Sequence, residues 1–172
     1  QGTMNNLIIG DREGEFTYYE TIAGGFGARP DKDGMDGVQV GMTNTLNTPV
    51  ESMESEYPLR VETYALRPDS GGDGKHRGGL GLERSVTVET DATVSLLTER
   101  RRTAPAGVDG GADGAMGENL VDGDPVPSKA SVDVSAGATV TIRTPGGGGH
   151  GDPVDRSEEA READRRDEKV TE

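Results

Sequence analysis

Alternation of apolar and polar residues in steps of two is the dominant pattern along the chain, and it predicts β-strands. Residues 59–68, LRVETYALRP, show it clearly, with Leu59, Val61, Thr63 and Ala65 on one side. Period-two alternation and short apolar runs together predict roughly seven strands. The other predicted strands are residues 1–10, 15–22, 85–90, 93–100, 120–135 and 138–145.

Two of these segments carry further expectations about their pairing. Residues 85–90 and 93–100 are linked by Asp91 and Ala92, a connection of hairpin length, so the two strands are expected to pair with each other. Residues 120–135 alternate only weakly and contain two prolines. Because proline lacks the N–H that a strand ladder needs, this segment is predicted to be an edge strand at best.

Helical signals are short. Thr45 or Asn47 can cap a helix that has Pro49 near its first position and runs through about Ser55. The tail, residues 154–172, has almost no apolar side chains and predicts a solvated helix or a frayed terminus.

The fold class predicted is therefore mainly β (α+β). Short strands, long glycine-rich loops and one or two short helices are expected in a domain over residues 1–153. A charged tail, helical or disordered, is expected over residues 154–172, and Asp155 with Glu158 can form a capping box at its start.

Glycine-rich loops separate the predicted strands. Residues 23–37, 69–83 and 103–119 are too rich in Gly and in Asp, Ala or Pro for a regular element, so each is an ordered loop, a disordered loop or a site. The run Gly146–Gly149 continues into HGDP and contains the spacing G-x-G-x-x-G. A dinucleotide site is a weak interpretation, because no helix opens at this loop. Consecutive glycines do allow another backbone or a ligand to approach closely.

Composition makes a self-sufficient core doubtful. Only 30% of the residues are hydrophobic and 3% are aromatic, while 27 of 172 are glycine. Low hydrophobicity with high net charge is also typical of disorder. The specific patterning argues against global disorder and favours a domain that completes its core against another domain or subunit.

The charge of the chain is strongly acidic. The net charge is -14, and lysine occurs only at Lys32, Lys75, Lys129 and Lys169. Such a composition favours a salt-adapted, halophilic surface, since salt screens the self-repulsion, over an ordinary acidic protein. It also makes nucleic acid an unlikely partner, because the surface repels phosphates. The absence of cysteine excludes thiolate chemistry, and without a long apolar run a soluble cytoplasmic protein, not bound to a membrane, is the default expectation.

Candidate binding residues gather in a short polar stretch. Thr43, Asn44, Thr45 and Asn47 offer hydroxyls and amides that can grip a small polar ring, although turn residues of these types also satisfy their own backbone. Two arginines, Arg60 and Arg77, can hold a carboxylate as a fork or pair with a neighbouring acid. The two histidines lie in glycine loops, and no metal site is predicted from them. The sequence does not assign a catalytic residue.

Seven blocks of sequence then point to a family. In order, they resemble the C-terminal signature blocks of hydantoinase B type proteins, the group that includes 5-oxoprolinases, N-methylhydantoinases and acetone carboxylases. The blocks are GTMNN (2–6), YYETIAGGFGA (18–28), the stretch from Asp36 to Glu51 containing VQVGMTNTLNTPVE, YPLRVETYALRPDSGG (57–72), GKHRGGLGLER (74–84), TERRRTAPAGVDGG (98–111) and TPGGGGHGDP (144–153).

The resemblance implies ATP-dependent opening of a cyclic amide (hydantoin, N-methylhydantoin or 5-oxoproline), or in relatives the carboxylation of a ketone. It implies a hydantoinase A type partner that carries ATP and Mg, and an N-terminal region of the B-type subunit that can hold a divalent metal. No cofactor is expected on this chain itself. Gly41 stands where many members have a histidine, and the chain begins at Gln1, so a truncated, non-catalytic interaction fragment is the alternative.

Overall fold

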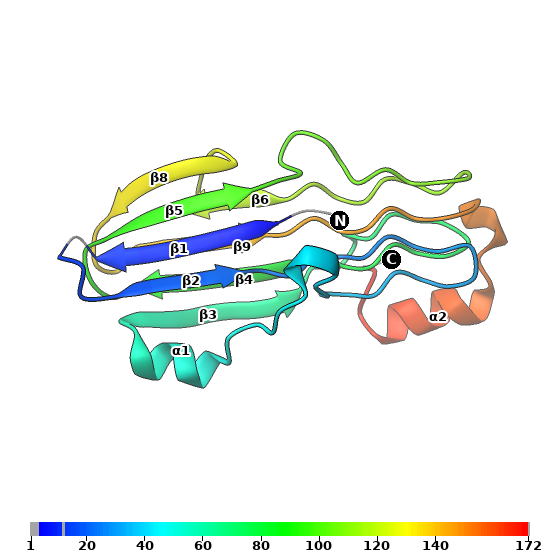
Figure 1. Cartoon of the computed structure of the whole chain (residues 1–172). Helices are drawn as coiled ribbons and strands as arrows, with labels where there is room; N and C mark the ends of the chain where they lie inside the picture. Colours follow the sequence, from blue (N-terminus) through cyan, green and yellow to red (C-terminus); the bar gives the residue numbers. More distant parts are fainter. Residues whose placement is uncertain (1–3, 12, 172) are drawn as a thin grey trace.

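Two antiparallel sheets pack face to face and form the larger part of the molecule (Figure 1). A computed structural model describes residues 4–11 and 13–171. The first sheet has the order β2 (Thr17–Thr21), β1 (Asn5–Asp11), β5 (Ala92–Thr98) and β8 (Lys129–Val134). The second has the order β3 (Leu59–Leu66), β4 (Leu82–Val88), β9 (Thr139–Arg143), β6 (Glu118–Val121) and β7 (Asp124–Pro125). The prediction of a mainly β (α+β) chain is confirmed.

Helices are few. The helix α1 (Val50–Glu56) precedes β3, and α2 (Glu158–Arg166) lies near the C-terminus. Two short 3-10 turns, η1 (Gly41–Thr43) and η2 (Pro153–Asp155), precede them. The predicted helix starting near Pro49 is therefore present, with Pro49 as its N-terminal cap residue.

A single apolar core lies between the two sheets. Alternate residues of β5, from Ala92 through Val94 to Leu96, are at most 1% exposed and face the other sheet. Val86 and Val140 meet them from the second sheet, each fully buried. The core is built mainly from aliphatic side chains of both sheets, joined by Tyr18 and by Met53 of α1, so the low aromatic content does not prevent a continuous core within the chain.

The predicted hairpin between the strands around 85–90 and 93–100 is wrong, because β4 and β5 lie in different sheets. Both edges of each strand are already occupied: β4 pairs with β3 and β9, and β5 pairs with β1 and β8. The short connection crosses from one sheet to the other, and both strands bury their apolar faces in the same core.

The segment predicted as a single edge strand at 120–135 divides into three strands. β6 and β7 form a hairpin around Asp122 and Gly123, both at positive φ (50° and 86°), the geometry of a type I′ turn. β6 is interior, since it also pairs with β9, whereas β8 is an edge strand of the other sheet. The edge prediction therefore holds for β7 and β8 and fails for β6.

The glycine-rich loops form a second body beside the sandwich, where extended segments run side by side without strand ladders (Figure 1). Residues 145–150, called the central segment from here on, pass through its middle. N–H groups that lie three residues apart in this segment bond to the same neighbouring segment: Gly146 and Gly149 donate to the carbonyls of Ala115 and Ala112, at 3.1 and 2.9 Å. Gly147 and His150, also three residues apart, donate to the carbonyls of Gly79 and His76. On a third side, Gly25 and Ala28 donate to the carbonyls of Pro145 and Gly148, which are again three residues apart. A period of three residues is that of a polyproline II helix.

Close packing explains why the central segment is made of glycine. A Cβ atom on any of its four glycines would overlap backbone of a neighbouring segment. The carbonyl groups met are those of Ser70, Phe26, Ala106 and Asp73, for Gly146 to Gly149 in turn. The first and the fourth glycine thus face the same neighbouring segment, as a three-residue period requires. The loops predicted as ordered, disordered or functional are an ordered bundle of backbones.

The described part of the tail folds back along this bundle (Figure 1). The cap of α2 is Ser157, whose Oγ accepts from the N–H of Ala160, and not the Asp155 of the expected capping box. Asp164 of α2 is only 7% exposed. The tail is therefore helical over Glu158–Arg166, as one of the two expectations had it, with Asp164 buried and most of the other helix residues partly or fully exposed.

Candidate functional site

The polar loop, residues 39–48, holds four of the six residues singled out from the sequence. Its side chains bond mostly to one another: the Gln39 amide donates to Asn47 Oδ1 at 2.9 Å, and the Thr45 hydroxyl donates to Gln39 Oε1 at 2.9 Å. The Thr43 hydroxyl donates to the backbone carbonyl of Val40 at 3.0 Å. The side chain of Asn44 is exposed and has no hydrogen-bond partner among residues 4–11 and 13–171. The loop is thus internally ordered and leaves the Asn44 side chain exposed.

A buried ion pair contacts this loop at Thr48. Arg84 of β4 and Glu20 of β2 are 1% and 4% exposed, and Nε and Oε2 approach to 2.9 Å. Glu20 also accepts the backbone N–H of Thr48 at 3.0 Å. Burial and the Glu20 carboxylate raise the pKa of the neighbouring Tyr18 to about 12, so this phenol stays protonated near neutral pH and is excluded as a general base.

The two arginines predicted as ligand-binding residues do not join the polar loop. Arg60 lies exposed on β3 and bonds to Glu62 at 2.8 Å. Arg77 is 3% exposed in the glycine-rich bundle, and its guanidinium bonds to acids and to the Gly78 carbonyl. The structure therefore brings together Thr43, Asn44, Thr45 and Asn47 and gives each arginine separate partners.

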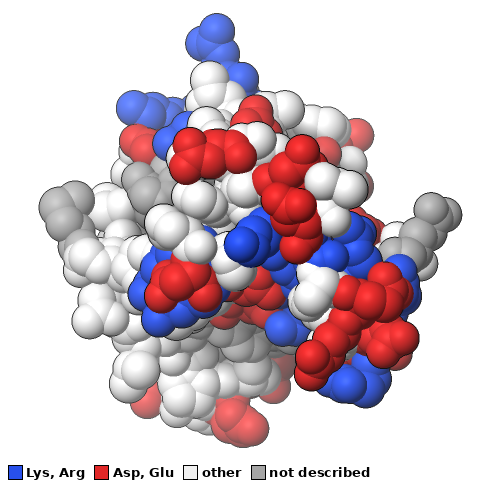
Figure 2. All heavy atoms as spheres, turned by 90° about the vertical axis from the view of Figure 1, so that its right-hand side faces the viewer, with Lys and Arg blue, Asp and Glu red and all other residues white. Residues whose placement is uncertain are grey.

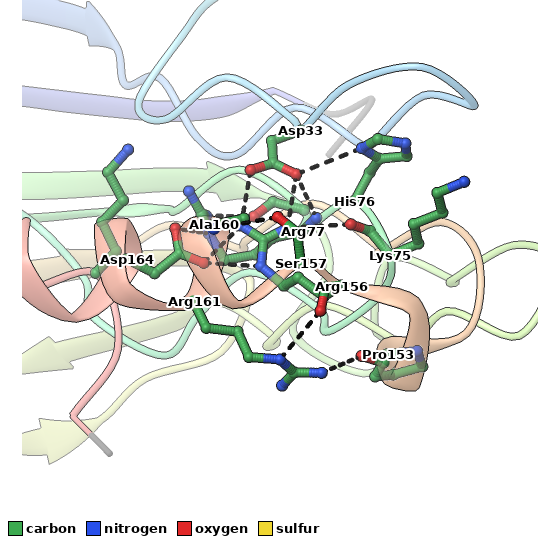
Figure 3. A network of polar contacts seen from close by, with 12 residues as sticks. Asp33, Lys75, His76, Arg77, Pro153, Arg156, Ser157, Ala160, Arg161 and Asp164 are labelled. Carbon is green, nitrogen blue, oxygen red and sulfur yellow. Dashed lines mark hydrogen bonds and ion pairs between the residues drawn. The ribbon is translucent and has the colours of Figure 1, made fainter.

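Arg77 belongs to a second cluster, the arginine–aspartate network of Asp33, Asp36, Arg77, Arg156 and Asp164. Figure 3 shows Asp33, Arg77, Arg156 and Asp164 of this network. Arg156 follows η2 and lies between two acids: it binds both oxygens of Asp33 at 2.9 and 2.8 Å, and Asp164 at 2.6 Å. Arg77 binds Asp36 and Asp164 from the other side, each at 3.2 Å. The network joins residues 33–36, residues 74–81 and the tail.

The charges within this network balance one another. With Lys169, which lies 3.0 Å from Asp36, three cations face three aspartates. A hollow of about 180 Å³ lies beside the network, and its charged lining consists of Arg77, Arg156, Arg161 and Arg165 with Asp73 and Asp164. Figure 2 shows acidic and basic side chains interleaved on this end of the molecule. The cluster connects the tail to the bundle, and its own three cations and three aspartates balance.

Metal ligands are not grouped in the described part of the chain: no three His, Asp or Glu side chains there are placed to hold one ion. His76 and His150 face each other through backbone hydrogen bonds of 3.0 and 2.9 Å. The nearest acids to their rings are different residues, Asp33 at 3.8 Å and Asp109 at 3.2 Å. The described side chains therefore do not fit a metal site.

The acids of the network predict how stability depends on pH. Burial alone would raise the pKa of Asp33, but hydrogen bonds from Arg156 and from the Arg77 backbone outweigh burial and lower it; the pKa of Asp36 is lowered similarly, by the Leu80 N–H and Lys169. A pKa below the unfolded value of about 3.9 means that the network stabilises the fold above that pH. The stabilisation is lost as pH falls through the folded pKa.

We therefore expect the free energy of unfolding to decline below about pH 4, and the decline to be smaller in Asp33→Asn. Urea unfolding between pH 2 and 7 measures both. Equal pH profiles for the two proteins would contradict the assigned role of Asp33.

Comparison with known proteins identifies the family. Residues 1–153 match the family described as Hydantoinase B/oxoprolinase. An uncharacterised protein of Methanocaldococcus jannaschii is 48% identical over 99% of this chain, and 5-oxoprolinase 1 of Arabidopsis thaliana is 45% identical over 90%. These matches cover 31% and 12% of the two relatives, so the chain spans less than a third of their length.

Solved structures agree with this assignment. The ATP-dependent caprolactamase from Pseudomonas jessenii superposes with a TM-score of 0.81 and 26% identity, over 98% of this chain and 32% of that one. Acetone carboxylase superposes with a TM-score of 0.76 over 99% of this chain and 28% of that one, and at 20% identity this likeness shows the fold alone. The chain belongs to the hydantoinase B/oxoprolinase family.

Proposed function

We propose that this chain is the framework domain of the B-type component of an ATP-dependent cyclic-amide hydrolase. The observation that carries this is its 45% identity, over 90% of its length, to a protein named 5-oxoprolinase. The structural likeness to a protein named ATP-dependent caprolactamase supports the same substrate class. The cyclic amide would be a hydantoin, N-methylhydantoin or 5-oxoproline.

The geometry supports a framework role over an independent active site. The buried arginine network is neutralised internally, and the described side chains do not fit a metal site. ATP and Mg would therefore be held by a hydantoinase A type subunit, and a divalent metal by the N-terminal region of the B-type subunit. The polar loop would offer the exposed side chains of Asn44 and Thr45 to the substrate, while Thr43 and Asn47, which bond within the protein, would hold the shape of the loop. Arg60 and Arg77 would not contact the substrate directly.

Two alternatives are weaker. The proposal of ketone carboxylation is supported only by the structural likeness to acetone carboxylase, which at 20% identity concerns the fold and not the reaction. A non-catalytic interaction fragment is consistent with Gly41, which lies within the polar loop, exposed and at a positive φ of 65°, where many family members resemble this chain but have a histidine.

No helix in the described ranges is long and apolar enough to cross a membrane. The cytoplasm, where ATP is available, is the compartment that fits the proposed activity. The net charge of -14 with few lysines supports operation in concentrated salt.

Reconstitution tests the proposed function. The chain is combined in molar KCl with an A-type subunit and the N-terminal region of a B-type subunit, and ATP hydrolysis is measured with 5-oxoproline, hydantoin, N-methylhydantoin or acetone. We expect a cyclic amide to stimulate ATP hydrolysis only when this chain is present.

Stimulation by acetone alone, in the presence of bicarbonate, would support the carboxylase alternative instead. If no compound stimulates ATP hydrolysis although the three parts co-purify, the interaction-fragment alternative holds and the proposed activity is wrong.

A further inference from the structure

Arg84 occupies a position where an apolar side chain is expected. On β4 it alternates with Leu82 and Val86, whose side chains point into the core. In the other sheet, Glu20 of β2 lies in the same way between Tyr18 and Ile22, two residues whose side chains are buried in the core. A charged pair therefore sits at inward-facing positions of both sheets, against the rule that such positions hold apolar residues.

The pair is incompletely hydrogen-bonded. The contact between Arg84 Nε and Glu20 Oε2, at 2.9 Å, is an ion pair but lacks hydrogen-bond geometry. Within the described part of the chain, Nη1 of Arg84 is also buried without a hydrogen-bond partner, while Nη2 donates only to Met53 Sδ at 3.6 Å. Buried charges in this condition contribute little net stability, because desolvation offsets their attraction. We therefore look for the role of the pair in the other groups that the two side chains contact.

Both side chains lead to the polar loop. Glu20 accepts the Thr48 backbone N–H at 3.0 Å. The Arg84 guanidinium lies 4.5 Å from the ring centroid of Tyr64, a cation–π contact, and the Tyr64 hydroxyl accepts from the Asn47 amide. Arg84 thus contacts two of the groups that bond to the C-terminal half of the loop, Glu20 and Tyr64.

We propose that Arg84 is a positioning residue that sets the conformation of residues 43–48 through Glu20 and Tyr64. The loop then presents the Asn44 amide and its neighbouring hydroxyls in one arrangement toward a cyclic amide. The choice of substrate rests on the proposed function, whereas the control of the loop by Arg84 does not. Lysine cannot replace it, since an ammonium lacks the planar fork that contacts a carboxylate and a ring together.

Amide hydrogen exchange on the 172-residue chain tests the structural half. Arg84→Met and Arg84→Lys are compared with Val86→Ala, which weakens the core on the same strand without touching the pair. In both Arg84 variants we expect the Thr48 amide to exchange roughly tenfold faster, beyond any change at the core amide of Val140. In Val86→Ala the two amides should change together.

Arg84→Lys keeps the positive charge, so it provides the test if the Arg84→Met variant fails to fold. Glu20→Gln provides a second route, since it keeps a hydrogen-bond acceptor but removes the charge that Arg84 binds, and the Thr48 amide should again exchange faster. Thr48 exchange that follows Val140 in all these variants would overturn the positioning role.

Kinetics of the reconstituted enzyme test the catalytic half. Both Arg84 variants should raise KM for the cyclic amide by about tenfold and change kcat little, because a misplaced loop weakens substrate binding. The Val86→Ala control should leave KM unchanged. An unchanged KM in both Arg84 variants would overturn the inference. A wild-type complex without turnover would instead refute the proposed function, and the exchange result would still decide whether Arg84 positions the loop.

Discussion

Replacing Gly147 by alanine should strongly destabilise the folded chain, although it adds only one methyl group. The new Cβ would overlap the Phe26 carbonyl and lie 2.7 Å from the Gly27 nitrogen. Both contacts are backbone, so no side chain can turn away. Overpacking of this kind costs about 3 kcal/mol or more. For a chain of this size, that lowers Tm by roughly 6–12 °C.

Gly27→Ala is the matched control within the same bundle. A Cβ at Gly27 meets only the Gly148 carbonyl, at 3.9 Å, an ordinary van der Waals distance. Thermal unfolding in constant salt should show little change for this variant. Equal Tm values for Gly147→Ala and the wild type would mean that the bundle is looser than described.

Loss of the Asp164 carboxylate should release the tail from the bundle. Asp164 is shared by Arg77 and Arg156, and all three side chains are at most 9% exposed. In Asp164→Ala both guanidiniums lose a partner while they remain buried, and breaking a buried pair costs about 3–5 kcal/mol. We expect faster trypsin cleavage at Arg165 and Arg166, together with a lower urea midpoint.

Asp167→Asn provides the comparison for this variant. Asp167 pairs with Arg166 at 3.2 Å, but both side chains are well exposed, so the change should be worth about 0.5 kcal/mol or less. Trypsin cleavage of Asp164→Ala at the Asp167→Asn rate would show that the network does not hold the tail.

Period-two patterning is sufficient to predict most strands, because each strand buries one face in a shared core. It cannot assign strands to sheets. The link at Asp91 and Ala92 is short enough for a hairpin. The two strands do not pair because β3 and β9 occupy both edges of β4, and β1 and β8 occupy both edges of β5. The polyproline-like bundle has no such signal, since its periodicity lies in backbone contacts between distant segments.

The candidate site shows a similar division. The polar loop is visible as a run of short polar residues, but its support is not, because charged residues such as Glu20 and Arg84 are ordinarily exposed. The parity of each strand carries a signal: Arg84 shares the inward phase of Leu82 and Val86. Arg77 pairs with acids, which is one of the two alternatives that the sequence left open for it, and its role as a substrate-binding residue stays a prediction. Its partner Asp164 is 87 residues away in sequence and was not predictable from spacing.

Amide exchange in the reconstituted enzyme, with and without the cyclic amide that it turns over, tests the central claim most directly. A framework role predicts that the substrate slows exchange in residues 43–48 and leaves residues 145–150 and the arginine–aspartate network unchanged. Slower exchange at the network or the central segment, with none at the polar loop, would contradict it.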